Sequence, residues 1–452
     1  MSTKPPLVVA VEMGFGHLRA ADAVARALGQ PLLQADRAPL ADEGERALWA
    51  RTRRNYERLS RWSTVPGLGL PFRRLLESIT HIPPLHPAHD LSAPTFSTGL
   101  LERLITRGLG RGMLAALERE QAPLFTTFFA TALAADRRTK ADVDCLVTDT
   151  DLARAWVPRM PTQSRIRYFA PSERAARRLV AYGVPEARVL LTGFPLPDEL
   201  LGGPDLVVAR RHLARRLARL DRRGRFRDAL GAEAPRRLGV APAVEVDDEA
   251  PLLVFAVGGA GAQAGLATRF LPSLRPLIEA RRLRVALLAG TRPAVARGFE
   301  ALIARCDLAG HPSVRVVAAT DLDGYFRACN ALLAEADVLW TKPSELTFFA
   351  GLGLPLVLSP PVGAQERYNR RWAIEHGAAL AQREPRAAGD WLAEWLDDGA
   401  LAGAAWNGFT RLPTRGLYRI LSAFERAPAA QDEARSLAAR RDGASATRSS
   451  GS

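Results

Sequence analysis

Residues 252–263 read LLVFAVGGAGAQ, an unbroken apolar run that ends in glycines. Six consecutive apolar residues without alternation are typical of a parallel strand that is covered by helices on both faces. The glycines that follow let the backbone approach a ligand closely, and a helix starting there offers free N–H groups and the positive end of its dipole. The stretch therefore predicts a strand, a ligand-binding turn and a helix.

The glycine spacing of this turn fits neither of two common nucleotide-binding motifs. It is not G-x-G-x-x-G, and G-x-x-x-x-G-K-[ST] occurs nowhere in the chain, so a P-loop is not expected. The turn suits a diphosphate, but glycines also serve tight turns between a strand and a helix. Both interpretations of residues 258–263 stay open on this evidence alone.

Outward from this turn, the chain alternates short apolar strands with segments of helical length. One such stretch runs from Leu7 to about Leu196, and the other begins at Leu252. Strands separated by helices indicate parallel βαβ units. We therefore predict an α/β fold with two Rossmann-like domains, residues 1–200 and 251–427. The expected strands are 7–11, 145–148, 166–170 and 189–191, then 252–257, 284–289, 314–318, 337–340 and 356–358.

The segment between the two domains, residues 201–250, is strongly basic. Eleven arginines lie between Arg210 and Arg237 against three acidic residues. Nucleic acid or an anionic membrane would suit such a patch. Phe226 is its only aromatic residue, so the stacking platforms of single-strand binders are missing. We interpret the segment as a solvated helical connector, expect no nucleic-acid partner, and predict a disordered tail at 428–452.

The bulk composition is that of a globular protein with an excess of basic residues. The 452 residues are 47% hydrophobic and carry a formal net charge of +14. No apolar run approaches the ~18 residues that cross a bilayer, and residues 1–6 lack a signal-peptide pattern. We expect a cytoplasmic protein with three buried thiols, no metal and no cofactor. The thiols belong to Cys145, Cys306 and Cys329, which form no metal or disulfide pattern.

Two further strands of the C-terminal half also end in polar loops. Residues 337–347 read DVLWTKPSELT, and residues 359–369 read SPPVGAQERYN. Open α/β sheets bind ligands at the carboxyl ends of their strands. Ordinary helix starts are the alternative, because serine and acidic residues also cap the first turn of a helix. The candidate ligand contacts in these loops are Lys342, Ser344, Glu345, Gln365 and Glu366.

The N-terminal half repeats this arrangement at residues 13–17, which read MGFGH after the first strand. A helix N-terminus disfavours a protonated imidazole and so keeps His17 neutral and able to accept a proton. The alternative is a histidine that caps or packs the helix. Asp149 and Asp151, which follow the expected strand 145–148, are the other candidate bases.

Several of these motifs, taken together, resemble the GT-B glycosyltransferases, in particular the monogalactosyldiacylglycerol synthase group and the N-acetylglucosaminyltransferase that builds the peptidoglycan lipid intermediate. The likeness covers roughly residues 7–200 and 251–425. The motifs that carry it are Gly14-x-Gly16-His17, Gly258-Gly259-x-Gly261-Ala262-Gln263, Lys342-Pro343 and Gly363-x-Gln365-Glu366-x-x-Asn369.

The resemblance implies two Rossmann-like domains facing a cleft, a UDP-sugar donor in the C-terminal half, and transfer with inversion without a metal for the nucleotide sugar. It implies that His17 lies near the transferred sugar, with Gly14 and Gly16 on the acceptor side. Carried over by position, Gly259, Gly261 and Gln263 would lie near the donor diphosphate, and Gln365 and Glu366 would face the donor sugar. The expected donor site also includes the neighbouring loop residues Gly258, Ala262, Lys342, Ser344 and Glu345.

One departure from the family pattern concerns the ribose. The family has a threonine followed three residues later by a glutamate, whereas here Ala350 follows Thr347 at that spacing. Glu345 is the nearest carboxylate. Either Glu345 has taken the ribose role or the nucleotide is held differently.

The segment 60–116 mixes apolar residues, prolines and arginines, and two interpretations of it stay open. In the first, the segment contacts a lipid acceptor or the anionic inner face of the membrane, which would make the protein a peripheral membrane protein. In the second, it is an insertion that packs on its own domain. For the whole chain we expect a glycosyltransferase acting on a lipid or other hydroxyl acceptor. The alternatives are a non-hydrolysing sugar-nucleotide 2-epimerase and an inactive relative that binds a nucleotide sugar or lipid.

Overall fold

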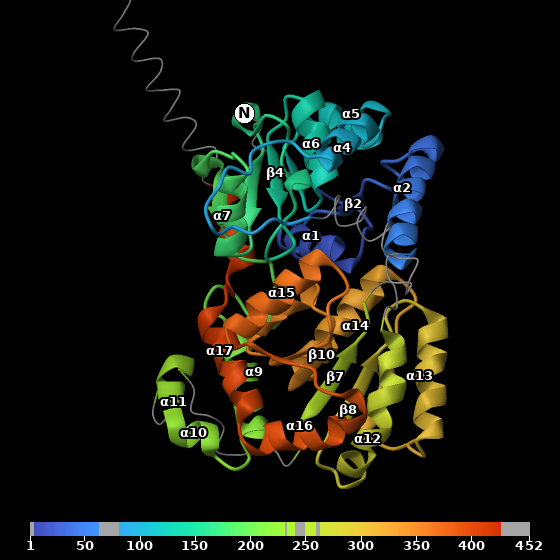
Figure 1. The fold of residues 1–452 in the computed structure, drawn as a ribbon, viewed down its shortest axis with the longest axis vertical. Coiled ribbons are helices and arrows are strands. Elements are labelled where there is room, and N and C mark those ends of the chain that lie inside the picture. Colours follow the sequence, from blue (N-terminus) through green and yellow to red (C-terminus); the bar gives the residue numbers. More distant parts are fainter. Residues whose placement is uncertain (1–3, 63–80, 231–232, 240–248, 259–262, 426–452) are drawn as a thin grey trace, which may run out of the picture.

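The computed structural model describes residues 4–62, 81–230, 233–239, 249–258 and 263–425, with the side chains of 55–62, 235 and 237 left aside. Its two halves each contain a six-stranded parallel sheet, and Figure 1 shows them one above the other. Three sets of predictions fall outside the described residues. They concern Gly259, Gly261 and Ala262, part of the segment 60–116, and the tail 428–452.

The N-terminal sheet has the strand order β2-β1-β3-β4-β5-β6. The chain leaves β1 toward β2 on one side and reaches β3 on the other, so the strand order reverses between β1 and β3. In open α/β sheets the crevice at such a reversal is where ligands bind. The strands are β1 (Leu7–Ala10), β2 (Leu32–Gln34), β3 (Leu124–Thr126), β4 (Val143–Leu146), β5 (Arg167–Ala170) and β6 (Val189–Leu191).

The C-terminal sheet has the order β9-β8-β7-β10-β11-β12, which is the Rossmann order 3-2-1-4-5-6. Its reversal lies between β7 and β10. Every residue of β7, β10 and β11 is buried, as expected for strands covered on both faces. The strands are β7 (Leu252–Ala256), β8 (Arg284–Leu288), β9 (Val314–Val317), β10 (Val338–Thr341), β11 (Leu356–Leu358) and β12 (Ala379–Ala381).

Helices flank both sheets and bury their apolar faces against them. Around the N-terminal sheet these are α1 (Phe15–Ala27), α2 (Glu43–Trp62), α4 (Phe96–Thr106), α5 (Arg111–Glu120), α6 (Phe129–Arg138) and α7 (Glu173–Ala181), with the short turns η1 (Arg154–Trp156), η2 (Pro161–Gln163) and η3 (Glu186–Arg188). Around the C-terminal sheet they are η4 (Ala264–Leu266), α12 (Ala267–Glu279), α13 (Pro293–Arg305), α14 (Leu322–Glu335), η5 (Glu345–Leu352), α15 (Ala364–Glu375), η6 (Pro385–Ala387), α16 (Ala388–Asp397) and α17 (Ala400–Arg411).

The connector begins with α8 (Asp198–Leu201) and α9 (Val207–Leu220) and continues through α10 (Arg225–Leu230) and α11 (Glu233–Leu238). The expectation that its arginines are solvated is wrong for two of them. Arg216 is buried and donates hydrogen bonds to the carbonyls of Leu333, Ala336 and Leu352. These carbonyls lie at the C-terminal ends of α14 and η5. A cation is favourable there because the last carbonyls of a helix lack partners within it and carry the negative end of its dipole. Arg219, also buried, pairs with Asp337.

The last described helical residues, 416–425, return to the N-terminal half. The Phe424 ring lies 5.5 Å from that of Phe125 and 5.9 Å from that of Phe169, both in the N-terminal sheet. The prediction of an α/β chain built from two Rossmann-like halves is confirmed. The three cysteines are free and buried, as expected. In the described part of the chain, no helix is long and apolar enough to span a membrane.

Candidate active site

The two sheets direct their carboxyl ends toward each other, which brings the predicted loops together. Gly16, at the start of α1, lies against Glu345, at the start of η5; a Cβ on Gly16 would be 3.2 Å from the Cβ of Glu345. Asp149 and Thr150, after β4, bond to Asn369 of α15. In Figure 1, α1 and α15 both lie at the boundary between the halves. The site is therefore formed by loops from both sheets.

His17 lies at the reversal of the N-terminal sheet. Its Nδ1 is 2.6 Å from the carbonyl oxygen of Thr127, the residue that follows β3, and 3.2 Å from Thr148 Oγ1. A carbonyl only accepts, so Nδ1 carries the proton and donates it to Thr127. Nε2 therefore keeps its lone pair, and it makes no hydrogen bond with any residue that the structure describes.

Burial keeps the His17 ring neutral. It lowers the pKa of His17 to about 4, although the hydrogen bond to Thr127 acts in the opposite direction. The ring stands edge-on to Phe128 at 5.0 Å and lies 6.2 Å from Trp156. The prediction of a neutral imidazole agrees with this pKa, but the cause is desolvation by aromatic neighbours.

Asp149 carries a carboxyl group of raised pKa. Burial is the largest cause and, with the nearby Glu345 and Glu366, raises the pKa of Asp149 to about 6 against the hydrogen bond from Asn369 and the charge of Lys342. A carboxylate with a pKa close to the working pH is suited to general base catalysis. Asp149 directly follows Thr148, whose hydroxyl contacts His17, so the two candidate bases belong to one site.

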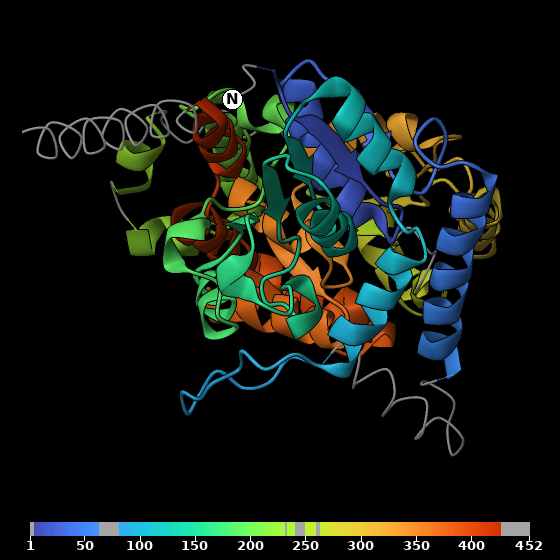
Figure 2. The ribbon, with the colours of Figure 1, turned by 90° about the horizontal axis from the view of Figure 1, so that it is seen from above.

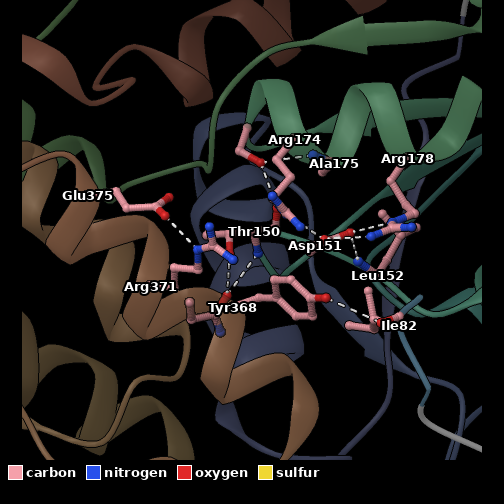
Figure 3. A network of polar contacts seen from close by, with 12 residues as sticks. Ile82, Thr150, Asp151, Leu152, Arg174, Ala175, Arg178, Tyr368, Arg371 and Glu375 are labelled. Carbon is pink, nitrogen blue, oxygen red and sulfur yellow. Dashed lines mark hydrogen bonds and ion pairs between the residues drawn. The ribbon is translucent and has the colours of Figure 1, made fainter. Parts of the chain in front are cut away.

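Asp151 is held very differently, although it is only two residues away. Its buried carboxylate pairs with Arg174 (Nε to Oδ2 2.6 Å) and with Arg178 (Nε to Oδ1 2.8 Å), and it accepts the backbone N–H of Leu152. Figure 3 shows both guanidinium groups converging on it. Both of its oxygens are thus occupied by guanidinium groups and are not free to meet a substrate. The geometry therefore favours a structural role for Asp151.

Lys342 lies at the reversal of the C-terminal sheet, between the ends of β10 and β7. Its stem packs so closely on Gly258 that a Cβ there would be 2.6 Å from Lys342 Cε. Its ammonium is 2.8 Å from Glu366 Oε1, while Glu366 Oε2 accepts the N–H of Val362. Burial alone would lower the pKa of Lys342, but Glu366, Glu345 and Asp149 raise it. Lys342 is therefore a charged, oriented donor beside the first glycine of the turn.

Glu345 faces the N-terminal half. Its carboxylate is 4.0 Å from Nε of Arg19, a buried residue of α1 whose guanidinium also contacts Asn330 and Cys329 of α14. Arg19 thus crosses from one half into the core of the other. Nothing in the spacing of the sequence indicated this contact.

The remaining predicted donor contacts lie at the same end of the C-terminal sheet. Gln263 donates a hydrogen bond to the carbonyl of Pro360, at 3.2 Å. Ser344 precedes η5 without capping it through its side chain. Gln365 lies in the first turn of α15 next to Glu366. On the acceptor side, Gly14 is exposed and has a φ of 113°, a backbone conformation that favours glycine.

Asn369 joins the two halves, although the sequence indicated no more for it than a position in a motif. The buried amide accepts two hydrogen bonds from Thr150 and donates two, to Asp149 and to the carbonyl of Pro343. One turn earlier on the same helix is Glu366, the partner of Lys342. The only sequence signal was its place three residues after Glu366, on the same face of a helix.

Comparisons with known proteins find similarity in fold only. No protein-family model matches the chain, and a search of curated proteins finds no match. The fold is similar to that of MurG from Acinetobacter baumannii, at 14% identity over 93% of this chain and 100% of that one, with a TM-score of 0.49.

Two other solved structures of similar fold bear names of nucleotide-sugar and glycosyl-transfer enzymes. The UDP-GlcNAc 2-epimerase of Methanocaldococcus jannaschii, in complex with UDP-GlcNAc and UDP, is 12% identical over 93% of this chain and 99% of that one (TM-score 0.39). The glycosyltransferase SnogD from Streptomyces nogalater is 16% identical over 92% and 98% (TM-score 0.42). Glycosyltransferases are thus among the solved structures that this fold resembles, as the motifs predicted.

Proposed function

We propose that the chain is a glycosyltransferase of the GT-B type, which moves a sugar from a UDP-sugar to a hydroxyl acceptor with inversion. The observation that carries the proposal is the position of Lys342. Its side chain lies against Gly258 at the strand reversal of a Rossmann sheet, where such sheets bind nucleotides. A charged donor there would stabilise the negative charge that develops on a leaving diphosphate.

In the proposed reaction, the acceptor hydroxyl attacks the anomeric carbon while a base takes its proton. We assign Asp149 as that base, because its pKa of about 6 leaves it ionised yet basic at neutral pH. His17, neutral and with Nε2 unprotonated, accepts a hydrogen bond from the acceptor or the transferred sugar. The C–O bond to the diphosphate breaks as the new C–O bond forms, so the configuration inverts.

The donor sugar is proposed to contact Gln365 and Glu366 in the first turn of α15. Carboxylate and amide groups suit sugar hydroxyls, because each hydroxyl both donates and accepts. Glu366 is already oriented by Lys342 and by the N–H of Val362. Glu345 is held against Gly16 and Arg19, so we propose that it joins the two halves and that the ribose is not its main partner.

We propose a lipid acceptor, reached from an anionic membrane surface. One face of α4 presents the apolar Phe96 and Leu100 and then Arg103 and Arg107, all exposed and spaced by three or four residues. Met160, which is 59% exposed, lies close by, since Arg159 pairs with Glu102 of α4. Apolar residues that enter the interface beside arginines that meet anionic headgroups are typical of peripheral attachment.

The function is tested by incubating the protein with a panel of radiolabelled UDP-sugars, with and without a lipid extract. We expect label in the lipid fraction together with free UDP, and we expect neither product from Asp149→Asn. A UDP-sugar that is converted without any acceptor would instead establish the epimerase. Binding of a UDP-sugar without turnover would establish an inactive relative.

A further inference from the structure

The side-chain amide of Asn369 uses all of its hydrogen-bonding capacity. Oδ1 accepts from the backbone N–H and the hydroxyl of Thr150, both at 2.9 Å. Nδ2 donates to Asp149 Oδ1 at 2.9 Å and to the Pro343 carbonyl at 3.2 Å. Because the N–H of Thr150 only donates and the carbonyl of Pro343 only accepts, the amide has one possible orientation. Its bond to Asp149 is therefore fixed as donor to carboxylate.

These four bonds tie two separate loops to one helical position. Asp149 and Thr150 follow β4 in the N-terminal half, whereas Pro343 follows Lys342 in the C-terminal half. Asn369 itself is on α15 and fully buried. It lies one turn after Glu366, which holds the Lys342 ammonium. The carboxylate proposed as the base is thus bonded to the same turn that is proposed to hold the donor.

The preceding residue of α15, Tyr368, reinforces this link. The hydroxyl of Tyr368 donates to the carbonyl of Ile82, at 3.2 Å, and the Arg174 guanidinium lies over the Tyr368 ring, 4.8 Å from its centre. Arg174 in turn pairs with Asp151, two residues after Asp149 (Figure 3). Figure 2, seen from above, shows the irregular segment around residues 81–95 running along the outside of the N-terminal half. Helix α15 therefore contacts the N-terminal half at several points around Asp149.

We infer that Asn369 is a positioning residue, which holds the Asp149 carboxylate in one orientation and couples it to the donor-binding turn of α15. The catalytic consequence rests on the proposed function; the positioning itself does not. A charge-assisted hydrogen bond at a buried carboxylate favours its ionised form. Without Asn369, Asp149 would keep its burial and would still face Glu345 of η5 and Glu366 of α15, against which the charge of Lys342 acts. Its affinity for a proton would rise.

Three variants separate positioning from mere packing. Asn369→Leu keeps the volume and removes all four bonds. Asn369→Asp keeps an acceptor for Thr150 but replaces the donor to Asp149 by a second carboxylate. Thr150→Val is the matched control, because it removes one bond to Asn369 and leaves the Asn369–Asp149 bond in place.

The readout is the titration of the Asp149 carboxyl carbon by NMR in the full chain labelled with [γ-¹³C]aspartate, with the signal assigned by its loss in Asp149→Asn. The titration is expected to move to higher pH in Asn369→Leu and in Asn369→Asp, and to stay in place in Thr150→Val. Turnover at neutral pH should fall about tenfold or more in both Asn369 variants. If Asn369→Leu does not fold, Asn369→Asp answers the same question.

An unshifted titration in the Asn369 variants, or an equal shift in Thr150→Val, would overturn the positioning role. A shifted titration in a protein that transfers no sugar would leave the positioning role standing and sink the proposed glycosyltransferase instead. The two failures are thus distinguishable.

Discussion

The aliphatic stem of Lys342 lies directly on Gly258, so a Cβ added to this glycine would sit 2.6 Å from Lys342 Cε. Non-bonded carbon atoms do not approach so closely, so the lysine side chain must move in Gly258→Ala. We expect UDP affinity to fall about tenfold in this variant, because the ammonium leaves the diphosphate. Gly265→Ala is the control, since its Cβ would meet nothing within 4 Å. Equal affinity in both variants, by calorimetry, would mean that Lys342 does not bind the donor.

Asp149→Asn is expected to stabilise the protein while it lowers turnover. Because the folded pKa of Asp149 is raised from 3.8 to about 6, the folded state binds the proton more tightly, and stability falls as pH rises between these values. At pH 7.5 the neutral amide should therefore raise the free energy of unfolding by about 1–3 kcal/mol. Turnover should fall by about 10² to 10⁴.

The pH profile of the wild type checks the same assignment. Turnover should rise with pH through about 6, as Asp149 loses its proton. Asp142→Asn, at an exposed position just before β4, is the control and should change neither property. Nearly full turnover in Asp149→Asn, with a large loss in His17→Gln, would transfer the role of base to His17.

His17 should make the protein sensitive to acid. The pKa of His17 is about 4 in the folded state and lies below the usual 6.5. Between these two pH values the unfolded state therefore binds the proton more tightly than the folded state. The contribution of His17 to stability is complete above pH 6.5 and is lost as pH falls toward 4. In denaturant titrations, His17→Gln should remove about 1–3 kcal/mol of the pH dependence in this window. The same change at the exposed His89 should have no such effect; an unchanged slope in His17→Gln would contradict the buried, neutral ring.

Membrane attachment should depend on the exposed face of α4. Wild-type protein is expected to sediment with vesicles that contain phosphatidylglycerol at low salt and less so at high salt, because salt screens the arginines. Phe96→Asp combined with Met160→Asp should abolish sedimentation. Val207→Asp is the control, since Val207 is 59% exposed but lies on α9, which packs on the C-terminal half. Equal sedimentation of all three proteins would show that this surface does not attach the protein to the membrane.

The sequence predicted those elements whose signal is local. The apolar runs of β7, β10 and β11 indicated fully buried strands, and the structure has them within one or two residues of the expected ranges. It did not indicate β2, β3 or β12, which have the sequences LLQ, LFT and ALA. Three residues give no periodicity, and unlike the equally short β11 none of these strands consists of large apolar residues throughout. Because β3 was not predicted, there was also no reason in the sequence to consider Thr127, whose carbonyl fixes the His17 tautomer.

The site was predicted less completely than the fold because its key contacts are distant in sequence. Asp149 and Asp151 look equivalent in the sequence. They differ in the structure because Arg174 and Arg178 of α7 pair with Asp151. Asn369 bonds to residues about 220 positions earlier in the chain. Arg19 reaches Asn330 from the other half. No residue spacing encodes contacts of this kind.

The most direct test of the account is calorimetric titration of UDP into the wild type, Lys342→Met and Glu345→Gln. We predict binding to the wild type and little change in Glu345→Gln. In Lys342→Met we predict a loss of about ten- to a hundredfold, since one charge-assisted contact contributes ~1.5–3 kcal/mol. A large loss in Glu345→Gln would show that this carboxylate holds the ribose. UDP bound equally by the wild type and Lys342→Met, or no binding of millimolar UDP, GDP, ADP or TDP, would contradict a nucleotide-sugar site at the β7–β10 reversal.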